Sequence, residues 1–374
     1  MPRNRVIYQS DALFVATGNI ATTAAHTSGD IAQLHRVQSA NYGFSIARQN
    51  INQFGNLARI DSILMDPPTV NMDFTYYLGS GTNESLLGFN VGTAITTATS
   101  FISGLVDTTK VGTISGRNFH IFTAPEGNDA NGLGATATQF TGNNASTISI
   151  GNGFVTNYSV DAAVGSIPKV NISVEGLNIN VVEGSTGLNP AVAIETSLTG
   201  TNGFVLPPPV TGSIGVTALR PGDITMTVDE GFLVDMPTGI DNSSNTAAHI
   251  QSFSIACPVK RTTLQRLGSN FGYAKVIDFP LEVTVNVSAT VADLKAAGDL
   301  SSVITSDGFK TLQFNFNDST GTAKLVYKVK NAKLVSENLT SAIGSNKKVD
   351  LVFSAQVGGP QDTTNGLFVA TSTS

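Results

Sequence analysis

The sequence has few charged residues, no tryptophan and one cysteine in 374 residues. Charged side chains make up 13%, against roughly 25% in ordinary soluble domains. Because Cys257 has no second thiol to join, an intrachain disulfide and a cysteine-based zinc site are excluded. No apolar run approaches the roughly 20 residues of a membrane-spanning helix, and the N-terminal region lacks a signal-peptide pattern. We therefore expect a protein made in a cytoplasm, with no membrane segment.

The sequence also has no basic patch or tail of the kind that binds phosphates. The formal net charge is −6, with 21 Lys and Arg against 27 Asp and Glu. A surface with so few cations predicts that any encounter with DNA is non-adhesive. The low charge also favours a chain whose surface is largely covered by partners.

The abundant residues are Gly, Thr, Ser, Asn and Val, and the dominant pattern is strict alternation of apolar and polar residues. Alternation with period two is typical of strands with one buried face. It predicts a first strand or hairpin from Val6 and Tyr8 to Leu13–Val15, and further strands at 69–78, 120–124, 146–163, 168–176, 281–291, 311–318, 324–339 and 348–357. Helical patterns are few: 29–40, 83–89, and 290–306 with Thr290 as its cap. The fold class predicted is mainly β.

Two long stretches are rich in Gly, Thr, Asn and Pro. Residues 116–147 are interpreted as a loop inserted within a domain, and residues 182–215 as a linker between domains.

The chain repeats itself. Residues 151–176 align without a gap on 330–355, with Asn152 on Asn331, Gly165 on Gly344 and Lys169 on Lys348. Weaker matches keep the same order: 11–18 with 229–239 (Phe14 on Phe232), 38–47 with 251–256, 52–56 with 265–270, and "TAAH" at 23–26 and 246–249. Because the matches are collinear, we predict an internal duplication: a first β-domain at 1–181, a linker at 182–215 and a second β-domain at 216–374.

Residues that carry chemistry are scattered. The four histidines, His26, His35, His120 and His249, form no metal-binding motif. The carboxylates Asp61 and Asp66, and Asp229 and Glu230, are better explained as solvated loop charges than as acid/base pairs. Cys257 follows an apolar strand and is interpreted as a buried structural thiol. We predict no catalytic, cofactor-binding or metal-binding residue, and no enzyme activity.

Residues 34–89, from "LHRVQSANYGFSIARQ" to "TNESLLGF", resemble the N-terminal half of a bacteriophage tail tube protein, and 151–176 is similar to the paired strands that close that domain. The resemblance implies small β-sandwich or barrel domains with a flanking helix. It further implies rings of six domains whose inner strands join into one barrel, and stacking of the rings into a tube. It places at 17–40 and 236–250 the long loop that reaches the next ring.

Two fused domains then predict trimeric, pseudo-hexameric rings in the virion of a long-tailed phage. The expected partners are further copies of the chain and other tail proteins, with DNA passing through the lumen without specific binding. The alternatives are a baseplate hub or distal tail protein, an extracellular adhesin or surface-layer protein, and a β-sandwich glycosidase. The absence of tryptophan platforms argues against the glycosidase.

Overall fold

The structure is a computed structural model that describes residues 11–16, 29–64, 68–106, 116–124, 129–130, 145–191, 203–208, 224–228, 248–265, 267–268, 272, 274–291, 308–318, 320–341 and 346–373. Within these ranges strands dominate, and the helical elements are α1 (Thr82–Leu87) and the short 3-10 helix η2 (Phe101–Leu105). The prediction of a mainly β fold is confirmed.

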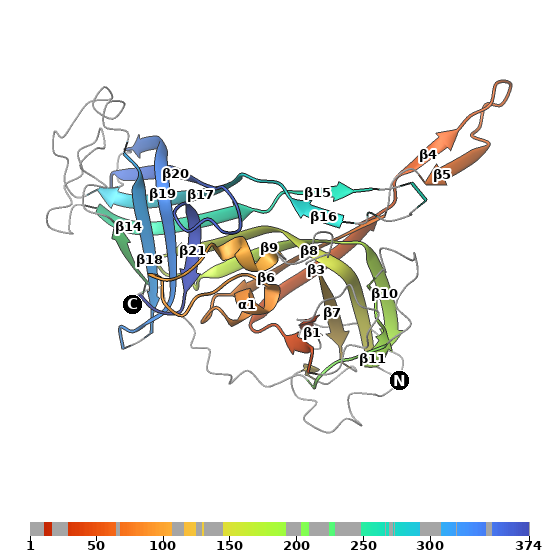
Figure 1. The fold of residues 1–374 in the computed structure, drawn as a ribbon, viewed down its shortest axis with the longest axis horizontal. Coiled ribbons are helices and arrows are strands. Elements are labelled where there is room, and N and C mark those ends of the chain that lie inside the picture. Colours follow the sequence, from red (N-terminus) through yellow and green to blue (C-terminus); the bar gives the residue numbers. More distant parts are fainter. Residues whose placement is uncertain are drawn as a thin grey trace.

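The centre of the molecule is one antiparallel sheet to which both halves of the chain contribute (Figure 1). We call it the long sheet. Its strands, in spatial order, are β3 (Val37–Ser45), β6 (Thr69–Tyr77), β9 (Lys169–Gly176), β8 (Ser146–Ala163), β14 (Ala248–Pro258), β17 (Leu281–Val291), β20 (Lys348–Val357) and β19 (Ala323–Thr340). The two halves of the chain meet where β8 pairs with β14.

Two flanking sheets pack against the long sheet, and each is reached by a strand that belongs to both. The first part of β8 pairs with β7 (Arg117–Thr123) and β10 (Asn178–Glu183), and β7 continues to β1 (Asp11–Ala16) and β2 (Ile31–Gln33). The first part of β19 pairs with β18 (Lys310–Asn317) and β21 (Gly366–Ala370), and β18 continues to β13 (Ile224–Val228).

Both shared strands change sheets at an asparagine. Asn152 in β8 has φ 51° and Asn331 in β19 has φ 55°, a left-handed conformation that asparagine tolerates better than most residues. These are the two asparagines that the sequence alignment matched. Both halves thus have the same spatial order, β1–β7–β8–β9–β6–β3 and β13–β18–β19–β20–β17–β14.

The strand registers of the two halves also agree residue by residue. Val160 pairs with Val170 in the first half, and Leu339 pairs with Val349 in the second, each 179 positions later. The irregularities coincide as well, since the register shifts between Val37 and Ser39 in β3 and between Ile250 and Ser252 in β14. These registers give a position-by-position correspondence that does not depend on sequence similarity.

That correspondence corrects two of the sequence matches. The counterpart of β1 is β13, so the match of Phe14 to Phe232 is wrong; the register places Phe14 at Thr227. Within 38–47, the match of Gln38 to Gln251 agrees with the structure, but the Phe-Ser-Ile-Ala match is four positions out, because Phe44 corresponds to Cys257. Residues 23–26 and 246–247 of the "TAAH" pair lie outside the described residues.

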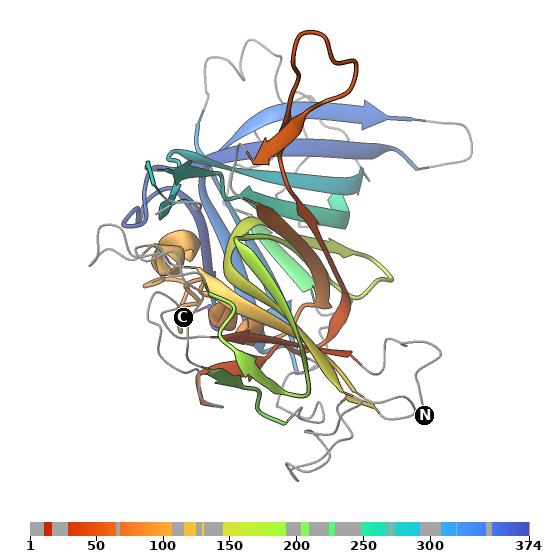
Figure 2. The same cartoon turned by 90° about the vertical axis from the view of Figure 1, so that its right-hand side faces the viewer.

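Each half carries a two-stranded hairpin after the first strand of its part of the long sheet. These are β4 (Arg48–Ile51) with β5 (Asp61–Leu64), and β15 (Arg261–Leu264) with β16 (Ala274–Ile277). Gly55 and Gly268 stand at corresponding positions between the paired strands, with φ of 93° and 83°. Both hairpins extend toward the same side, and β4–β5 stands clear of the body (Figures 1 and 2).

The helix predictions have mixed outcomes. The helix predicted at 83–89 is confirmed as α1, which ends at Gly88 with φ 96°. The helix predicted at 29–40 is wrong: this segment forms β2 and the start of β3, whose backbones pair with β1 and β6. Thr290 is not a helix cap but the tenth residue of β17, opposite Lys348 of β20, and 292–306 lie outside the described residues. Of the predicted ring-contact loops at 17–40 and 236–250, the described residues are largely strand as well.

The predicted loop at 116–147 and the predicted linker at 182–215 also contain strands. All of β7 and the start of β8 lie in the former, and β11 (Thr186–Leu188) and β12 (Gly203–Val205) pair in the latter. Phe204 and Leu206 are buried in a cluster with Phe14 and Phe122. The described part of the linker is therefore packed on the first half.

One hydrophobic core runs beneath the long sheet through both halves. Phe74 of β6 contacts Phe119 of β7 in the first half, with ring centroids 6.0 Å apart. In the second half Phe253 of β14 stacks on Phe314 of β18 at 4.1 Å. The two predicted domains share this core, because the β8–β14 contact continues it without a break.

Candidate functional site: the polar face of the long sheet

The long sheet has one apolar and one polar face. In β17, Val283, Val285 and Val287 are buried in the core, whereas the alternate residues Thr284 and Asn286 lie on the opposite face. The same alternation holds in β6, β9 and β20. It follows from the period of two in a strand, and we call the solvent-facing side the polar face.

Small and polar residues form continuous rows across the polar face. In one row each residue is the cross-strand partner of the next, from β3 to β19: Ser39, Thr75, Asn171, Ser159, Ala256, Thr284, Ser354 and Lys333. This row crosses the β8–β14 contact without interruption. The polar face is thus one surface to which both halves contribute equally.

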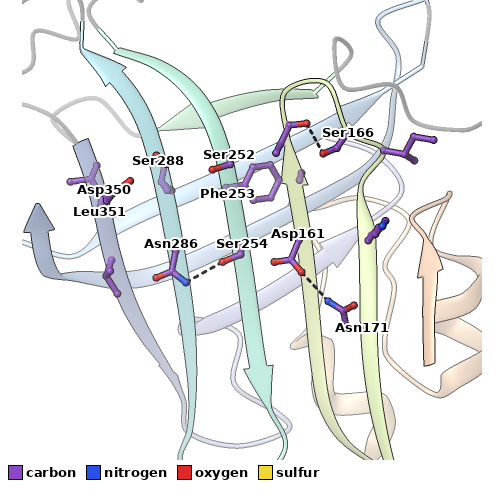
Figure 3. Close-up of a pocket in the computed structure, with 16 residues that line it drawn as sticks. Asp161, Ser166, Asn171, Ser252, Phe253, Ser254, Asn286, Ser288, Asp350 and Leu351 are labelled. Carbon is purple, nitrogen blue, oxygen red and sulfur yellow. Dashed lines mark hydrogen bonds between the residues drawn. The ribbon is translucent and has the colours of Figure 1, made fainter. Parts of the chain in front are cut away.

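The polar side chains of this face bind one another. The Asn171 amide donates to Asp161 Oδ2 at 2.9 Å, and the Asn286 amide donates to Ser254 Oγ at 3.0 Å (Figure 3). Ser354 Oγ donates to Glu282 Oε1 at 2.7 Å. These bonds occupy donor groups of Asn171, Asn286 and Ser354, so fewer donors on this face are left to bind a ligand.

Charges on the polar face are sparse and more often negative than positive. The carboxylates are Asp73, Asp161, Glu175, Glu282 and Asp350, and the amines are Lys169, Lys333 and Lys348. Glu175 is already paired with Lys275 of β16. No arginine stands at these strand positions, so none of them carries a bidentate phosphate-binding group.

The polar face has an open hollow of about 490 Å³ where β9, β8, β14, β17 and β20 run side by side. Asp161, Ser254, Asn286 and Asp350 line it from four different strands (Figure 3). Its lining includes no histidine or cysteine, so it holds no nucleophile–base pair of the serine–histidine or cysteine–histidine type. An open recess spread over several strands encloses a small substrate poorly.

The two ends of the long sheet are open edges within the described residues. β3 pairs only with β6, and the 333–340 part of β19 pairs only with β20. Apolar side chains are exposed at both edges: Tyr42 is 44% and Phe44 65% exposed on β3, and Leu339 is 39% exposed on β19. Unpaired edges with exposed apolar residues are sites for pairing with another chain.

A buried polar cluster ties the two halves together under the sheet. Tyr76 donates to Glu84 Oε1 at 2.8 Å, Tyr158 lies 3.4 Å from the same oxygen, and the hydroxyls of Tyr158 and Tyr327 are 2.6 Å apart. Burial raises the pKa of Glu84 above its ordinary value, although hydrogen bonds from its own backbone and the two tyrosines oppose this. A perturbed carboxyl often marks a catalytic site, but Glu84 is 1% exposed, so its role is structural.

The structure describes three of the histidine and cysteine candidates, His35, His120 and Cys257, and they do not form a common site. His120 is buried, with Nδ1 2.8 Å from Ser149 Oγ and its ring 4.4 Å from that of Phe204. Burial, and secondarily Arg36, lowers the pKa of His35. Cys257 is confirmed as a buried thiol, and burial raises its pKa to about 12.

Asp61 is the remaining candidate whose side chain the structure describes. Asp61 is exposed and accepts a bond from the Ser62 backbone N–H at 2.7 Å. His26, Asp66, Asp229, Glu230 and the side chain of His249 lie outside the described residues. In the described part of the chain, no group of three or more His, Cys, Asp or Glu residues is placed to hold a metal ion.

Comparisons with known proteins do not assign a family to this chain. No protein-family model matches the sequence, and no curated protein matches it. None of the described helices has the length and apolar character needed to cross a membrane.

Proposed function

We propose that this chain is the tube subunit of a long-tailed bacteriophage, and that its two halves arose by duplication and fill two neighbouring positions of one ring. The observation that carries the proposal is the long sheet. It contains two sets of four strands in the same order and register, joined at β8–β14, with an open edge at each end. A subunit of this form supports a ring in which the same contact recurs between copies.

The polar face is the surface that such a ring would turn toward its channel. Three copies of the eight strands would give a barrel of 24 strands. With strands about 4.8 Å apart and tilted by about 40°, that barrel would be roughly 45–50 Å across between backbones. Sparse charges, mostly carboxylates, and side chains bonded to one another would let a polyanion slide without sticking. The subunit would therefore be a virion component that passes DNA without binding it specifically.

Closure of the ring would also account for the open edges and the low charge. A closed barrel has no edge strands. Exposed apolar residues on β3 and β19 are then covered by neighbours. The proposed partners are further copies of the chain, the next ring in the stack and other tail proteins.

Negative-stain microscopy of the purified chain tests the proposal. We expect rings with a central channel that stack into tubes of variable length. Single rings that never stack would instead favour a hub or distal tail protein. Particles that remain monomeric at high concentration, also after addition of preformed tail tips as a nucleus, would overturn the proposal.

A further inference from the structure

The internal β8–β14 contact specifies how two separate copies would meet. β8 corresponds to β19, and β14 corresponds to β3, by the registers of the two halves. Thus β19 and β3, the two open edges, are the counterparts of the two strands that already pair within the chain. We propose that β19 of one copy pairs antiparallel with β3 of a second copy, in the register of the internal contact.

This inference rests on the proposed function, because copies must meet edge to edge in the ring. The register itself is taken from the internal β8–β14 contact. Internally, Val160 lies opposite Ile255, and Asp161 lies opposite Ser254. Transferring each position to its counterpart places Leu339 opposite Tyr42 of the second copy, and Thr340 opposite Asn41. Asn338 then lies opposite Gly43, and Ser336 opposite Ser45.

Side-chain character supports this register, because it matches apolar to apolar on one face and polar to polar on the other. Leu339 and Tyr42 lie on the core side of their strands, since their cross-strand partners Val349 and Met72 are buried. Asn41, Thr340 and Asn338 lie on the polar side, opposite Asp73, Lys348 and Asp350 of the adjacent strands. A shift by one residue would turn one strand's apolar set toward the polar face.

The burial of the internal counterparts indicates what the contact would cover. Val160, Ile255 and Cys257 are all 0% exposed. Their counterparts Leu339, Tyr42 and Phe44 are 39%, 44% and 65% exposed in the single chain. Glu337 also lies on the core side of the β19 edge, opposite Leu351, and it carries a charge. It corresponds to Tyr158, and in the proposed register it would lie opposite Phe44. The open edges thus present the apolar surface that the chain buries at its own junction.

Disulfide trapping tests the register. The chain carrying Tyr42→Cys and Leu339→Cys is assembled and oxidised, and its products are separated without reductant. An intrachain bond is excluded, because seven strand spacings, roughly 34 Å, separate the two edges, whereas a disulfide needs Cα atoms within about 7 Å. The native Cys257 is buried and serves as an unreactive background thiol.

The matched control combines Tyr42→Cys with Glu337→Cys, which lies diagonal to the expected pair at roughly 7–8 Å. We expect intermolecular cross-links at least tenfold more abundant for the 42/339 pair than for the 42/337 pair. Equal yields, or a higher yield for 42/337, would overturn the register.

Microscopy of the same samples separates this inference from the proposed function. Rings that form without 42/339 cross-links would overturn the edge pairing and leave the tube proposal standing. Cross-links in particles that never stack would support the edge pairing and count against the tube.

Discussion

The contact between β8 and β14 can be compared with the two outer edges of the long sheet, because β19 and β3 at those edges correspond to β8 and β14. At β8–β14 the strands are paired and their core-side residues Val160 and Ile255 are 0% exposed. At the outer edges the corresponding Leu339 and Tyr42 remain partly exposed. Under the proposed duplication, the chain forms this contact once within itself and leaves the two equivalent edges for a partner, so that ring assembly would need no new kind of interface.

The largest expected effect comes from a charge at matched positions of the two contacts. Val160→Asp places an unpaired carboxylate in the core and should lower the free energy of unfolding by about 4 kcal/mol or more. Leu339→Asp, at the corresponding edge position, should change it by no more than about 0.5 kcal/mol but prevent ring formation. Urea unfolding of the monomer and sedimentation of the assembled protein measure the two effects.

Similar destabilisation by both substitutions would mean that the 333–340 edge is already covered within one chain. Normal ring assembly by the Leu339→Asp variant would show that β19 does not form the contact between copies.

A smaller effect is expected from the tyrosine that anchors the internal contact. Tyr158→Phe removes a hydroxyl bonded to Tyr327 across the two halves and should cost about 1–3 kcal/mol, because buried polar groups lose a partner. Tyr42→Phe at the open edge is the control and should stay within about 0.5 kcal/mol. Thermal or urea unfolding compares them, and equal losses would contradict a special role for the buried cluster.

The smallest effect is a pH dependence that comes from Glu84 in the buried cluster of tyrosines. Burial raises the pKa of Glu84 in the folded chain above its ordinary value of 4.5, so the folded state holds this proton more tightly than the unfolded state. The stability associated with protonated Glu84 is present below pH 4.5 and is lost as the pH rises through the folded-state pKa.

Unfolding free energies measured from pH 4.5 to neutrality should therefore fall less for Glu84→Gln than for the unmodified chain. Parallel curves would show that the Glu84 carboxyl does not titrate differently in the folded state.

The alternation of residues was enough to predict most strands and the polar face. The bounds 146–163 and 348–357 agree with β8 and β20, because apolar and polar residues alternate along most of both segments. The segment 29–40 was mistaken for a helix because Ile31 and Leu34 have helical spacing, whereas pairing with β1 and β6 determines its conformation. Tertiary hydrogen bonds overrode the local pattern.

The central contact could not be predicted from the sequence. β8 and β14 are not consecutive, and no local signal specifies which distant strands become neighbours. The repeated Phe-Ser-Ile-Ala suggested a register four residues away from the observed one, since short matches in a chain rich in Ser and Ala carry little information. The correspondence follows from the strand pairings, in which the irregularities near Val37 and Ile250 coincide. The Gln38–Gln251 match agrees with it, but so short a match does not specify a register.

A density map of one assembled ring would show whether the outer edges reproduce the internal contact. We expect three copies whose long sheets form one continuous barrel, with Leu339 opposite Tyr42 at each boundary and the polar face toward the channel. A ring in which β3 and β19 remain unpaired, or in which only one half of each chain lines the channel, would contradict it.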